Sequence, residues 1–575
     1  MCGFYGETFN LKRDETKKLS HLLNYRGNDE LNVSIEDDVF LMHSRLSITG
    51  TKHNSSQPIK SSCDRYHLVF NGEIYSIYGE DSEYLREYGD TLALLKAIEK
   101  YGVEDCFLRL NGMFSIVIHD LKENKIIMAN DYFGQKPLYY KVVEGQGVIF
   151  GSTGELLSEG KALDKDGVQD YITFGFVLPE NSIYSDVNRA RPGSLVVYDL
   201  VDKRLSITES YQNNNFYLDS SNNYDINLVL QDVMRDHSYS DFPIALALSG
   251  GVDSTLLYGV LDNETREKIN AFTVKSDDVE ESQNALLAVD YYGGKTELLD
   301  NFNVDSIELL KELILCLDEP NSDTAILSSS SIFRLASRNS KVIFLGDGGD
   351  ELFQGYNRHK IWNLLSRFPK DGFVASTLIS SLILPLVKVA AKIGKLSSQK
   401  LVILNNILSN LDDKRMFILS SLAIDDFNKY KYLENDSDFE GYPINFIDRK
   451  LYLPGNNLYR VDRLSLLYNI EARAPLLDLR VANASDKTSF KEKSTWNKSI
   501  LKRLRNSKYT GVNFDGKKMG FNTSVKRILQ STESQNYIDN AISKAKEFGF
   551  DFRGHTLSDR RRFNLLCFGL WLERM

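Results

Sequence analysis

Two patterns of apolar and polar residues divide the chain. Residues 2–155 contain short stretches in which apolar and polar positions alternate, separated by turns rich in Gly and Asn. Alternation with a period of two is typical of strands buried on one face, so this part predicts two packed sheets. Farther along, apolar strands at 245–248, 268–274 and 342–345 alternate with helical stretches. That order predicts βαβ units and an open parallel sheet, hence an α/β protein.

A polar stretch separates the two patterns. Between Val197 and Asn227 the chain carries NNN at 213–215 and SSNN at 220–223, which is typical of a linker. We therefore expect one domain at residues 1–210 and a second at 220–575, which would begin with an amphipathic helix at about 226–237. A length of 575 residues also exceeds one ordinary hydrophobic core.

The clearest chemical motif follows the strand at 245–248. Residues 249–254, SGGVDS, place two glycines and two serines between a strand and a helix start. Glycine lets the backbone approach a phosphate closely, and serine hydroxyls and the free amides of a helix start bind oxyanions. Asp253 would repel a phosphate, but it suits a Mg²⁺ ion bound to pyrophosphate. The spacing is not that of a Walker loop.

This loop resembles the pyrophosphate loop of the ATP-pyrophosphatases, which adenylate a substrate and release pyrophosphate. The resemblance implies ATP and Mg²⁺ as cofactors. The residues expected to contact ATP here are Leu248, Ser249, Gly250, Gly251, Asp253 and Ser254. Val274 ends the next strand and is a candidate neighbour of the adenine, because ligands of such sheets lie at the carboxyl ends of strands. A plain core valine fits the sequence equally well.

The second residue, Cys2, is a candidate nucleophile. Removal of Met1 would give it a free α-amino group, which titrates near pH ~8 and can take the thiol proton. A cysteine at this position means little alone, so the motifs that follow decide. They are YRGND at 25–29, HSRLSI at 43–48, QP at 57–58, VFNGEIY at 69–75, GDT at 89–91, NGMFS at 111–115 and DYFGQKPLYY at 131–140.

In this order the motifs resemble the glutaminase domain of the class II, N-terminal-nucleophile amidotransferases. The resemblance implies an αββα sandwich in which Cys2 attacks the side-chain amide of glutamine and releases ammonia. The residues expected to bind glutamine are Arg45, Leu46, Ser47, Ile48, Asn71, Gly72, Glu73 and Asp90.

The resemblance also distributes roles among these residues. Asn71 and Gly72 would donate to the oxyanion, and Arg45 would hold the α-carboxylate. Glu73 and Asp90 would hold the α-ammonium. The chain departs from the family at Tyr25, where a His is usual, and at Asn28, where a Pro is usual.

The strand at 342–345 runs into an acidic loop, GDGGDELFQGY, at residues 346–356. Its spacing is not that of an EF-hand, and it resembles the second signature of the asparagine synthetases. The resemblance places Leu345 and Gly346 at the adenylate and Asp350 at Mg²⁺ beside Asp253. At the position of Asp347 the asparagine synthetases usually carry a catalytic Glu, whose side chain is one methylene longer. At the position of Gln354 they usually carry a Gly.

Three later segments also match the asparagine synthetases: YRVDRLS at 459–465, IEARAPLLD at 470–478 and NKSILK at 497–502. The match implies that Lys498 neutralises the leaving pyrophosphate. A helix carrying Arg460 and Asp462 could cap the active site, or these residues could form a surface ion-pair network. The match is interrupted near residues 363–450, a helical segment whose role stays open.

The chain is therefore similar to glutamine-dependent amidotransferases of the asparagine synthetase type, with glutamine and an acceptor carboxylate as substrates. Free aspartate is the favoured acceptor because the signatures agree in order and spacing. Asp347 and Gln354 favour another carboxylate, such as a sugar uronic acid in surface-polysaccharide biosynthesis. Glu471, Arg473 and the Asp350-Glu351 pair are candidates for holding an amino-acid acceptor. A relative without catalytic activity is disfavoured by the intact nucleophile and phosphate loop.

Composition adds limits on partners and location. The net charge of −10 argues against a general nucleic-acid binder, and five scattered cysteines without CxxC suggest neither a zinc site nor disulfides. We expect a cytoplasmic protein, since the N-terminus lacks a signal-peptide pattern. The apolar run 372–387 is short for a membrane span, so a buried helix hairpin is expected, with a weak membrane-surface contact as the alternative. The oligomeric state is left open, a homodimer included.

Ammonia released by Cys2 is expected to travel inside the protein, along an apolar interface between the domains. In bulk water it would be protonated and would no longer act as a nucleophile.

Overall fold

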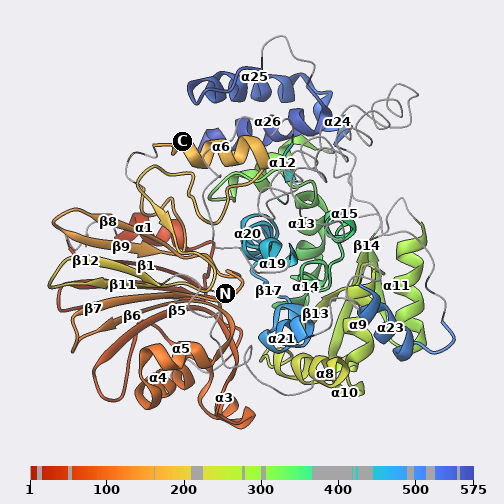
Figure 1. The fold of residues 1–575 in the computed structure, drawn as a ribbon, viewed down its shortest axis with the longest axis horizontal. Coiled ribbons are helices and arrows are strands. Elements are labelled where there is room, and N and C mark those ends of the chain that lie inside the picture. The colour runs from red at the N-terminus through yellow and green to blue at the C-terminus, as the bar shows by residue number, and fades with distance from the viewer. Residues whose placement is uncertain are drawn as a thin grey trace.

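The computed structural model describes residues 2–9, 16–49, 55–158, 160, 162–208, 225–274, 279–299, 306–365, 418, 422–424, 444–487, 498–512, 514, 525–552 and 557–575. Its N-terminal part, residues 2–208, contains two antiparallel sheets, and its C-terminal part, residues 225–575, contains one parallel sheet (Figure 1). The polar stretch at 209–224 and the apolar run at 372–387 lie outside the described residues. The domain boundary and the helix hairpin predicted there stay predictions.

The N-terminal part is a sandwich of two six-stranded sheets, as far as the described residues extend. Their strand orders are β10-β8-β9-β1-β3-β2 and β12-β11-β7-β6-β5-β4. Phe4 and Leu41 of the first sheet meet Val69 and Val117 of the second in one buried cluster. The strands are β1 Gly3–Glu7, β2 Glu30–Glu36, β3 Val39–Arg45, β4 Ile59–Lys60, β5 Tyr66–Ile77, β6 Leu110–Asp120, β7 Lys125–Asn130, β8 Tyr139–Val143, β9 Gly147–Gly151, β10 Asn188–Arg189, β11 Leu195–Asp199 and β12 Arg204–Thr208.

Helices cover both outer faces of this sandwich. Leu94 and Phe107 pack against the second sheet, whereas Leu23 and Tyr171 belong to the cluster that covers Tyr5 on the outer face of the first sheet. The helices are α1 Thr16–Leu23 and α6 Lys165–Phe174 on the first sheet, and α3 Ser82–Tyr88, α4 Asp90–Tyr101 and α5 Val103–Arg109 on the second. Alternate residues of a strand face opposite sides, so the strands β1, β3 and β6, buried along nearly their whole length, are covered on both faces. The αββα sandwich predicted from the sequence is confirmed.

The C-terminal part is built on a parallel sheet with the order β15-β14-β13-β16-β17. Its strands are β13 Ile244–Ala247, β14 Ile269–Val274, β15 Thr296–Leu299, β16 Val342–Phe344 and β17 Glu471–Arg473. The three predicted strands are confirmed, with ends shifted by one residue. The chain leaves β13 for β14 and β15 and returns to the other side of β13 as β16. Ligands of open sheets bind at such a change of direction, beyond the carboxyl ends of the strands.

Helices lie on both faces of the parallel sheet, and the predicted helix at 226–237 is α8. One face carries α8 Ile226–His237, α9 Val252–Val260, α11 Val279–Tyr291, α21 Leu479–Lys487 and α23 Ser499–Lys508, and the other carries α12 Ile307–Leu315, α13 Ala325–Ala336, α20 Tyr459–Leu467 and α26 Asp559–Trp571. The remaining elements are α10 Asn263–Lys268, α14 Gly349–Leu352, α15 Asn357–Leu365, α19 Ile444–Lys450, the π-helix η5 Leu453–Leu458, the 3₁₀ turns η6 Pro475–Leu477 and η7 Leu572–Arg574, α24 Lys526–Leu529 and α25 Thr532–Glu547. β17 is the edge strand on the side of the N-terminal part (Figure 1).

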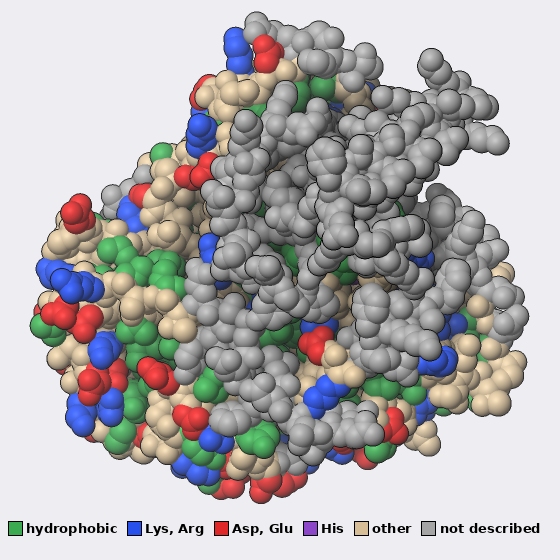
Figure 2. Space-filling view, viewed as in Figure 1, with side chains coloured by type: hydrophobic (Ala, Val, Ile, Leu, Met, Phe, Trp, Pro, Cys, Tyr) green, Lys and Arg blue, Asp and Glu red, His purple; other side chains and the backbone are tan. Residues whose placement is uncertain are grey.

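Acidic and basic side chains are interspersed over the visible surface of the N-terminal part (Figure 2). Among the described residues, no helix has the length and apolar character needed to cross a membrane.

Buried charges join the two parts. Arg26 donates to both carboxylate oxygens of Asp462, at 2.9 and 3.3 Å, and neither side chain is more than 2% exposed. Burial alone would raise the pKa of Asp462, but Arg26 and Lys136 outweigh it and hold that pKa below its usual range. The alternative of a surface ion-pair network for Asp462 is therefore wrong, because the residue lies inside the interface.

We predict that Asp462→Ala lowers the free energy of unfolding by about 3–5 kcal/mol, because it leaves the buried Arg26 charge uncompensated. The double replacement Arg26→Met with Asp462→Leu should recover part of this loss. Glu264→Ala is the matched control, since its ion pair with Lys268 is exposed and is worth about 0–1 kcal/mol. Denaturant unfolding measures all three. Equal losses for Asp462→Ala and Glu264→Ala would contradict the assignment.

Candidate active sites

Cys2 lies just before β1 and is held by two contacts of its backbone. Its nitrogen donates to Asn71 Oδ1 on β5 at 3.0 Å, and its carbonyl accepts from Arg26 Nε at 3.2 Å. The other end of the amide, Asn71 Nδ2, is buried and has no hydrogen-bond partner within the described residues. A buried donor without a partner beside a thiol is what an oxyanion site requires.

Gly72 continues this site because its backbone excludes any other residue. Its φ is +145°, and a Cβ there would lie 1.9 Å from the carbonyl oxygen of Met113 on the neighbouring strand. The thiol itself is in a mixed environment. Burial raises the pKa of Cys2, while the amino terminus, the amide of Leu46 and the Arg45 guanidinium act to lower it.

A small pocket opens beside the thiol. Its wall includes Cys2, Arg45, Leu46, Ile48, Gly72, Glu73 and Asp90 from the predicted set, together with Thr49, Ser55, Gln57, Phe70, Thr91 and Glu471. Arg45 donates to the carbonyl of Thr49 at 3.1 Å and to Ser55 Oγ at 2.7 Å. Ser47 is not part of this wall, since it lies nearer the surface, where its amide donates to Asp29.

Three carboxylates gather at one end of the pocket: Glu73, Asp90 and Glu471. Burial, with the neighbouring Glu471, raises the pKa of Glu73 well above its usual range, although Arg473 opposes the shift. Burial also raises the pKa of Asp90 to about 6, against hydrogen bonds from Thr91. Carboxylates therefore lie close together at this end of the pocket.

Sequence reasoning missed several members of this wall. The QP motif at 57–58 indicates Gln57 in the sequence. In the structure Gln57 Oε1 accepts from the Phe70 amide at 2.6 Å. Glu471 carried no signal for this pocket, because it comes from β17 of the C-terminal part. Together with Arg473 it is expected at an amino-acid acceptor; the structure places both residues near Glu73, and Arg473 also lines a cavity that includes Leu345 and Asp347.

The second site lies at the carboxyl ends of β13 and β16. After β13 the chain turns at Gly250, whose φ is +81°, and Ser249 Oγ lies 3.1 Å from Ser254 Oγ. Gly251, the residue before α9, has no side chain with which to cap the amides of the first helical turn. This is the geometry that binds a phosphate. Leu248 is buried, and Val274 is the last residue of β14.

Two carboxylates of this site contact one side-chain ammonium group, that of Lys498. Lys498 Nζ is bonded to Asp253 Oδ2 and lies 2.8 Å from Asp350 Oδ1. The other oxygen, Asp253 Oδ1, is buried without a hydrogen-bond partner among the described residues. A pair of carboxylates beside a phosphate-binding turn fits Mg²⁺, which takes one or two carboxylates together with phosphate oxygens. Within the same residues no cluster of three or more metal-binding side chains occurs.

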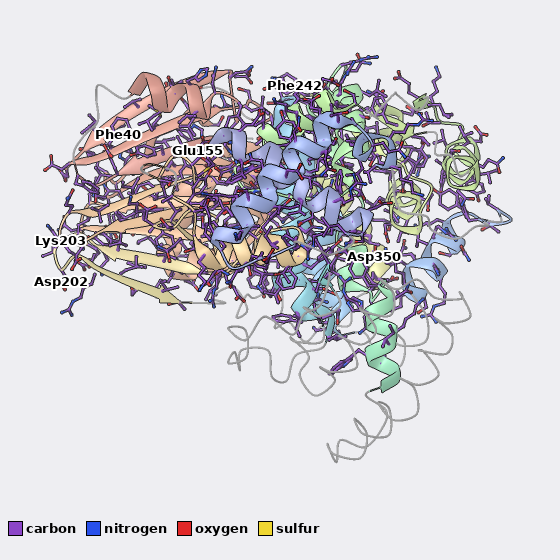
Figure 3. All side chains as sticks on the ribbon, turned by 90° about the horizontal axis from the view of Figure 1, so that it is seen from above. Phe40, Glu155, Asp202, Lys203, Phe242 and Asp350 are labelled. Carbon is purple, nitrogen blue, oxygen red and sulfur yellow. The ribbon has the colours of Figure 1, made fainter. Side chains whose placement is uncertain are left out.

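Glycines allow the acidic loop to approach the phosphate loop. A Cβ at Gly349 would lie 2.4 Å from Asp253 Oδ1, and one at Gly355 would lie 1.8 Å from Asp350 Oδ1. Gln354 has a φ of +54°, which explains why a Gly is usual there. Its side-chain oxygen accepts from Asn363 at 2.7 Å. Asp350 lies among the elements of the C-terminal part, far from Phe40 in the N-terminal sandwich (Figure 3).

A second cavity lies between the two sites. Leu345 and, from the acidic loop, Asp347 line it, and Met113, Gln135 and Lys136 line it from the N-terminal part. The rest of its wall is Leu458, Val461, Asp462, Ala472, Arg473 and Ala474. The wall of this cavity thus contains both apolar and charged side chains, whereas the sequence predicts an apolar interface. Burial lowers the pKa of Lys136, opposed by Asp462 and Glu471.

A third, larger cavity of about 510 Å³ lies among α6, η5 and α26, and its wall includes Asp323, Tyr452, Lys526 and Arg560. The ring of Tyr452 packs edge-on against Tyr356 at 5.8 Å, and the Tyr356 hydroxyl donates to Glu351 at 2.5 Å. The cavity wall therefore contacts the acidic loop through these two rings, since Tyr452 lines the cavity and Tyr356 ends the loop. Burial and the adjacent Asp350 raise the pKa of Glu351 to about 7.

Comparisons with known proteins agree with this arrangement. Residues 1–212 match the family described as glutamine amidotransferase domain, and residues 225–565 match the family described as asparagine synthase. Asparagine synthetase [glutamine-hydrolyzing] 1 of Bacillus subtilis is 25% identical, with 99% of this chain and 96% of that protein covered. Asparagine synthetase B of Escherichia coli is 23% identical, with coverages of 62% and 65%. The solved glutamine phosphoribosylpyrophosphate amidotransferase of B. subtilis is 14% identical, covers 53% of this chain and 67% of its own, and has a TM-score of 0.27, too low to bear on the fold.

We predict that glutamine affinity rises with pH through about 6, because an ammonium group binds the ionised carboxylate and Asp90 keeps its proton below that pH. Well below pH 6 the affinity should fall roughly tenfold per pH unit. Calorimetric titration of a Cys2→Ala variant, which we expect to bind glutamine without hydrolysing it, measures this profile. Asp90→Asn should weaken glutamine binding and make the affinity less dependent on pH below 6. If the pH midpoint of binding in that variant equals the midpoint in the Cys2→Ala parent, Asp90 is not the group that titrates.

Proposed function

Because the chain belongs to the asparagine synthase family, we propose that its nucleophile pocket supplies ammonia to an ATP-dependent activation site that forms an amide from a carboxylate. The chain is a glutamine-hydrolysing amidotransferase of the asparagine synthetase type. The observation that carries the proposal is the cavity between the two sites, which is lined from both parts and whose wall includes Leu345 and, from the acidic loop, Asp347.

In the first reaction Cys2 cleaves glutamine. Once Met1 is removed, the α-amino nitrogen of Cys2, positioned by Asn71 Oδ1, accepts the thiol proton. The sulfur attacks the side-chain amide carbon, and the oxyanion accepts hydrogen bonds from Asn71 Nδ2 and the Gly72 amide. The C–N bond breaks as the proton is returned to nitrogen, so ammonia leaves. Water then hydrolyses the thioester to glutamate.

In the second reaction an acceptor carboxylate oxygen attacks the α-phosphorus of ATP, and pyrophosphate leaves. Lys498 and the amides at the start of α9 stabilise the negative charge of the leaving group. Asp253 and Asp350 would hold Mg²⁺, which neutralises phosphate charge when bound. Ammonia from the cavity attacks the acyl carbon of the adenylate, AMP leaves, and Asp347 in the cavity wall takes up the proton.

We propose aspartate as the acceptor and asparagine as the product. The names of the relatives support this choice. The cavity beside Tyr452 is the proposed place for the part of the acceptor that does not react, since its wall carries both Asp323 and Arg560. Charges of both signs suit an amino acid, which carries an ammonium and a carboxylate.

Replacement of Cys2 by Ala should abolish glutamine-dependent amide formation and leave the reaction with added ammonium salt. The reason is that the thiol and the phosphate loop occupy separate sites in the two parts of the chain. Amide product measured with glutamine and with ammonium chloride decides the matter. A folded variant that lost both reactions would contradict the scheme, whereas an N-terminal tag that prevents Met1 removal should reproduce the effect of Cys2→Ala.

Aspartate should stimulate the formation of pyrophosphate and AMP, not ADP, from Mg²⁺-ATP. Lys498→Ala should cost roughly 2–4 kcal/mol of transition-state stabilisation, the scale for removal of a charge-stabilising group. Lys268→Ala is a matched control for loss of a lysine outside both the phosphate site and the proposed acceptor cavity, since Lys268 is exposed and pairs with the exposed Glu264. The assignment of aspartate is wrong if aspartate releases no more pyrophosphate than a reaction without acceptor. If a uronic-acid nucleotide sugar does stimulate pyrophosphate release, that class of carboxylate is the acceptor.

A further inference from the structure

The edge strand of the C-terminal sheet reaches the nucleophile pocket. Glu471 and Arg473 lie two residues apart on β17, so their side chains share one face of the strand. Each is about 1% exposed. Glu471 forms part of the wall of the pocket that contains Cys2 and Arg45, although it belongs to the other part of the chain.

Arg473 is fixed from the C-terminal side and is presented to the pocket. Its Nη1 donates to the carbonyls of His237 and Tyr239, at 2.6 and 2.7 Å, and its Nε donates to Glu471 Oε1 at 2.7 Å. The remaining nitrogen, Nη2, lies 3.2 Å from Glu73 Oε1. Nη2 makes no hydrogen bond among the described residues, so its contact with Glu73 is an ion pair alone. A planar guanidinium can place this charge beside Glu73 while it bonds the other three groups, which the single ammonium of a lysine cannot reproduce.

Charges of both signs meet at this end of the pocket. With all groups ionised, Glu73, Asp90 and Glu471 carry three negative charges, and Arg473 beside them carries one positive charge. Arg45 in the same wall, Lys136 and the amino terminus add positive charge. The raised pKa values of Glu73 and Asp90 have burial as their main cause and Glu471 as a further one. A ligand that brings a positive charge would relieve the repulsion among these carboxylates.

We propose that Glu471 and Arg473 complete the site for the α-ammonium group of glutamine, so that this site exists only where the two parts of the chain meet. Arg473 acts as a positioning residue that holds Glu73, and Glu471 contributes negative charge from the C-terminal part. The inference rests on the glutaminase reaction proposed above and adds a second part of the chain to its substrate site.

The same strand also contacts the acidic loop. The carbonyl oxygen of Arg473 accepts from the Leu345 amide at 2.9 Å, one residue before Gly346. The side chain of Arg473 thus lies at the glutamine site, while its backbone supports the start of the loop at the activation site. Glutamine hydrolysis therefore depends on the docked C-terminal part as well as on the motifs of the N-terminal part.

The test compares glutamine binding by Glu471→Gln and Arg473→Lys, each in the Cys2→Ala background, by calorimetric titration from pH 5 to 8. Both should bind glutamine about tenfold more weakly or worse, as expected for loss of a contact to a charged group. In Glu471→Gln the pH midpoint of binding should also fall, because the charge that helps to raise the pKa of Asp90 is gone. A residue with only a structural role would not move this midpoint.

Arg480→Lys is the matched control, because Arg480 makes partly buried ion pairs with Asp478 and Asp236 within the C-terminal part, outside the pocket wall. It should bind glutamine as the Cys2→Ala parent does. An affinity and a pH midpoint in Glu471→Gln and Arg473→Lys that equal those of the parent would overturn the proposal. Failure of the glutaminase assignment itself would look different, since the unmodified protein would then release no glutamate from glutamine.

Discussion

The buried pair of Arg26 and Asp462 is the contact on which the position of the nucleophile depends. Removing two charges from water costs several kcal/mol per ion, so such a pair is tolerated only where its geometry is good and its remaining donors are used. Here the guanidinium makes two bonds to the carboxylate and spends its third nitrogen on the carbonyl of Cys2. Arg26 therefore links the docking of the two parts to the placement of Cys2.

Much of each site could be predicted because its members are close in the sequence. The turn at Ser249 and Gly250, the strand before it and the helix after it follow from glycines, apolar periodicity and a helix start. Asn71, Gly72 and Glu73 lie on one strand, and their order could be matched to a family. Local patterns of this kind predict the structure of a segment and its contacts with residues nearby in the sequence.

Contacts between distant segments could not be predicted in the same way. Arg26 and Asp462 are 436 residues apart, and nothing near either residue distinguishes a buried pair from an exposed one. Glu471 and Arg473 lie in the segment at 470–478 that matches the asparagine synthetases, from which the sequence predicts a place at the acceptor and gives no sign of the contact with Glu73. The cavity that a side chain lines depends on how the two parts dock. The alternation of apolar and polar residues does not predict that docking. The left-handed backbone of Gln354, likewise, became visible only in three dimensions.

β17 has one further consequence, since it is a strand of three residues at the border of a parallel sheet. The backbone groups on the outer side of such a strand can pair with another chain, and proteins protect them by shortness, charge or cover. Here the strand is short, carries two charged side chains, and faces the N-terminal part. A C-terminal part made alone would lose that cover and would be prone to self-association, so the glutaminase part also shields its partner from aggregation.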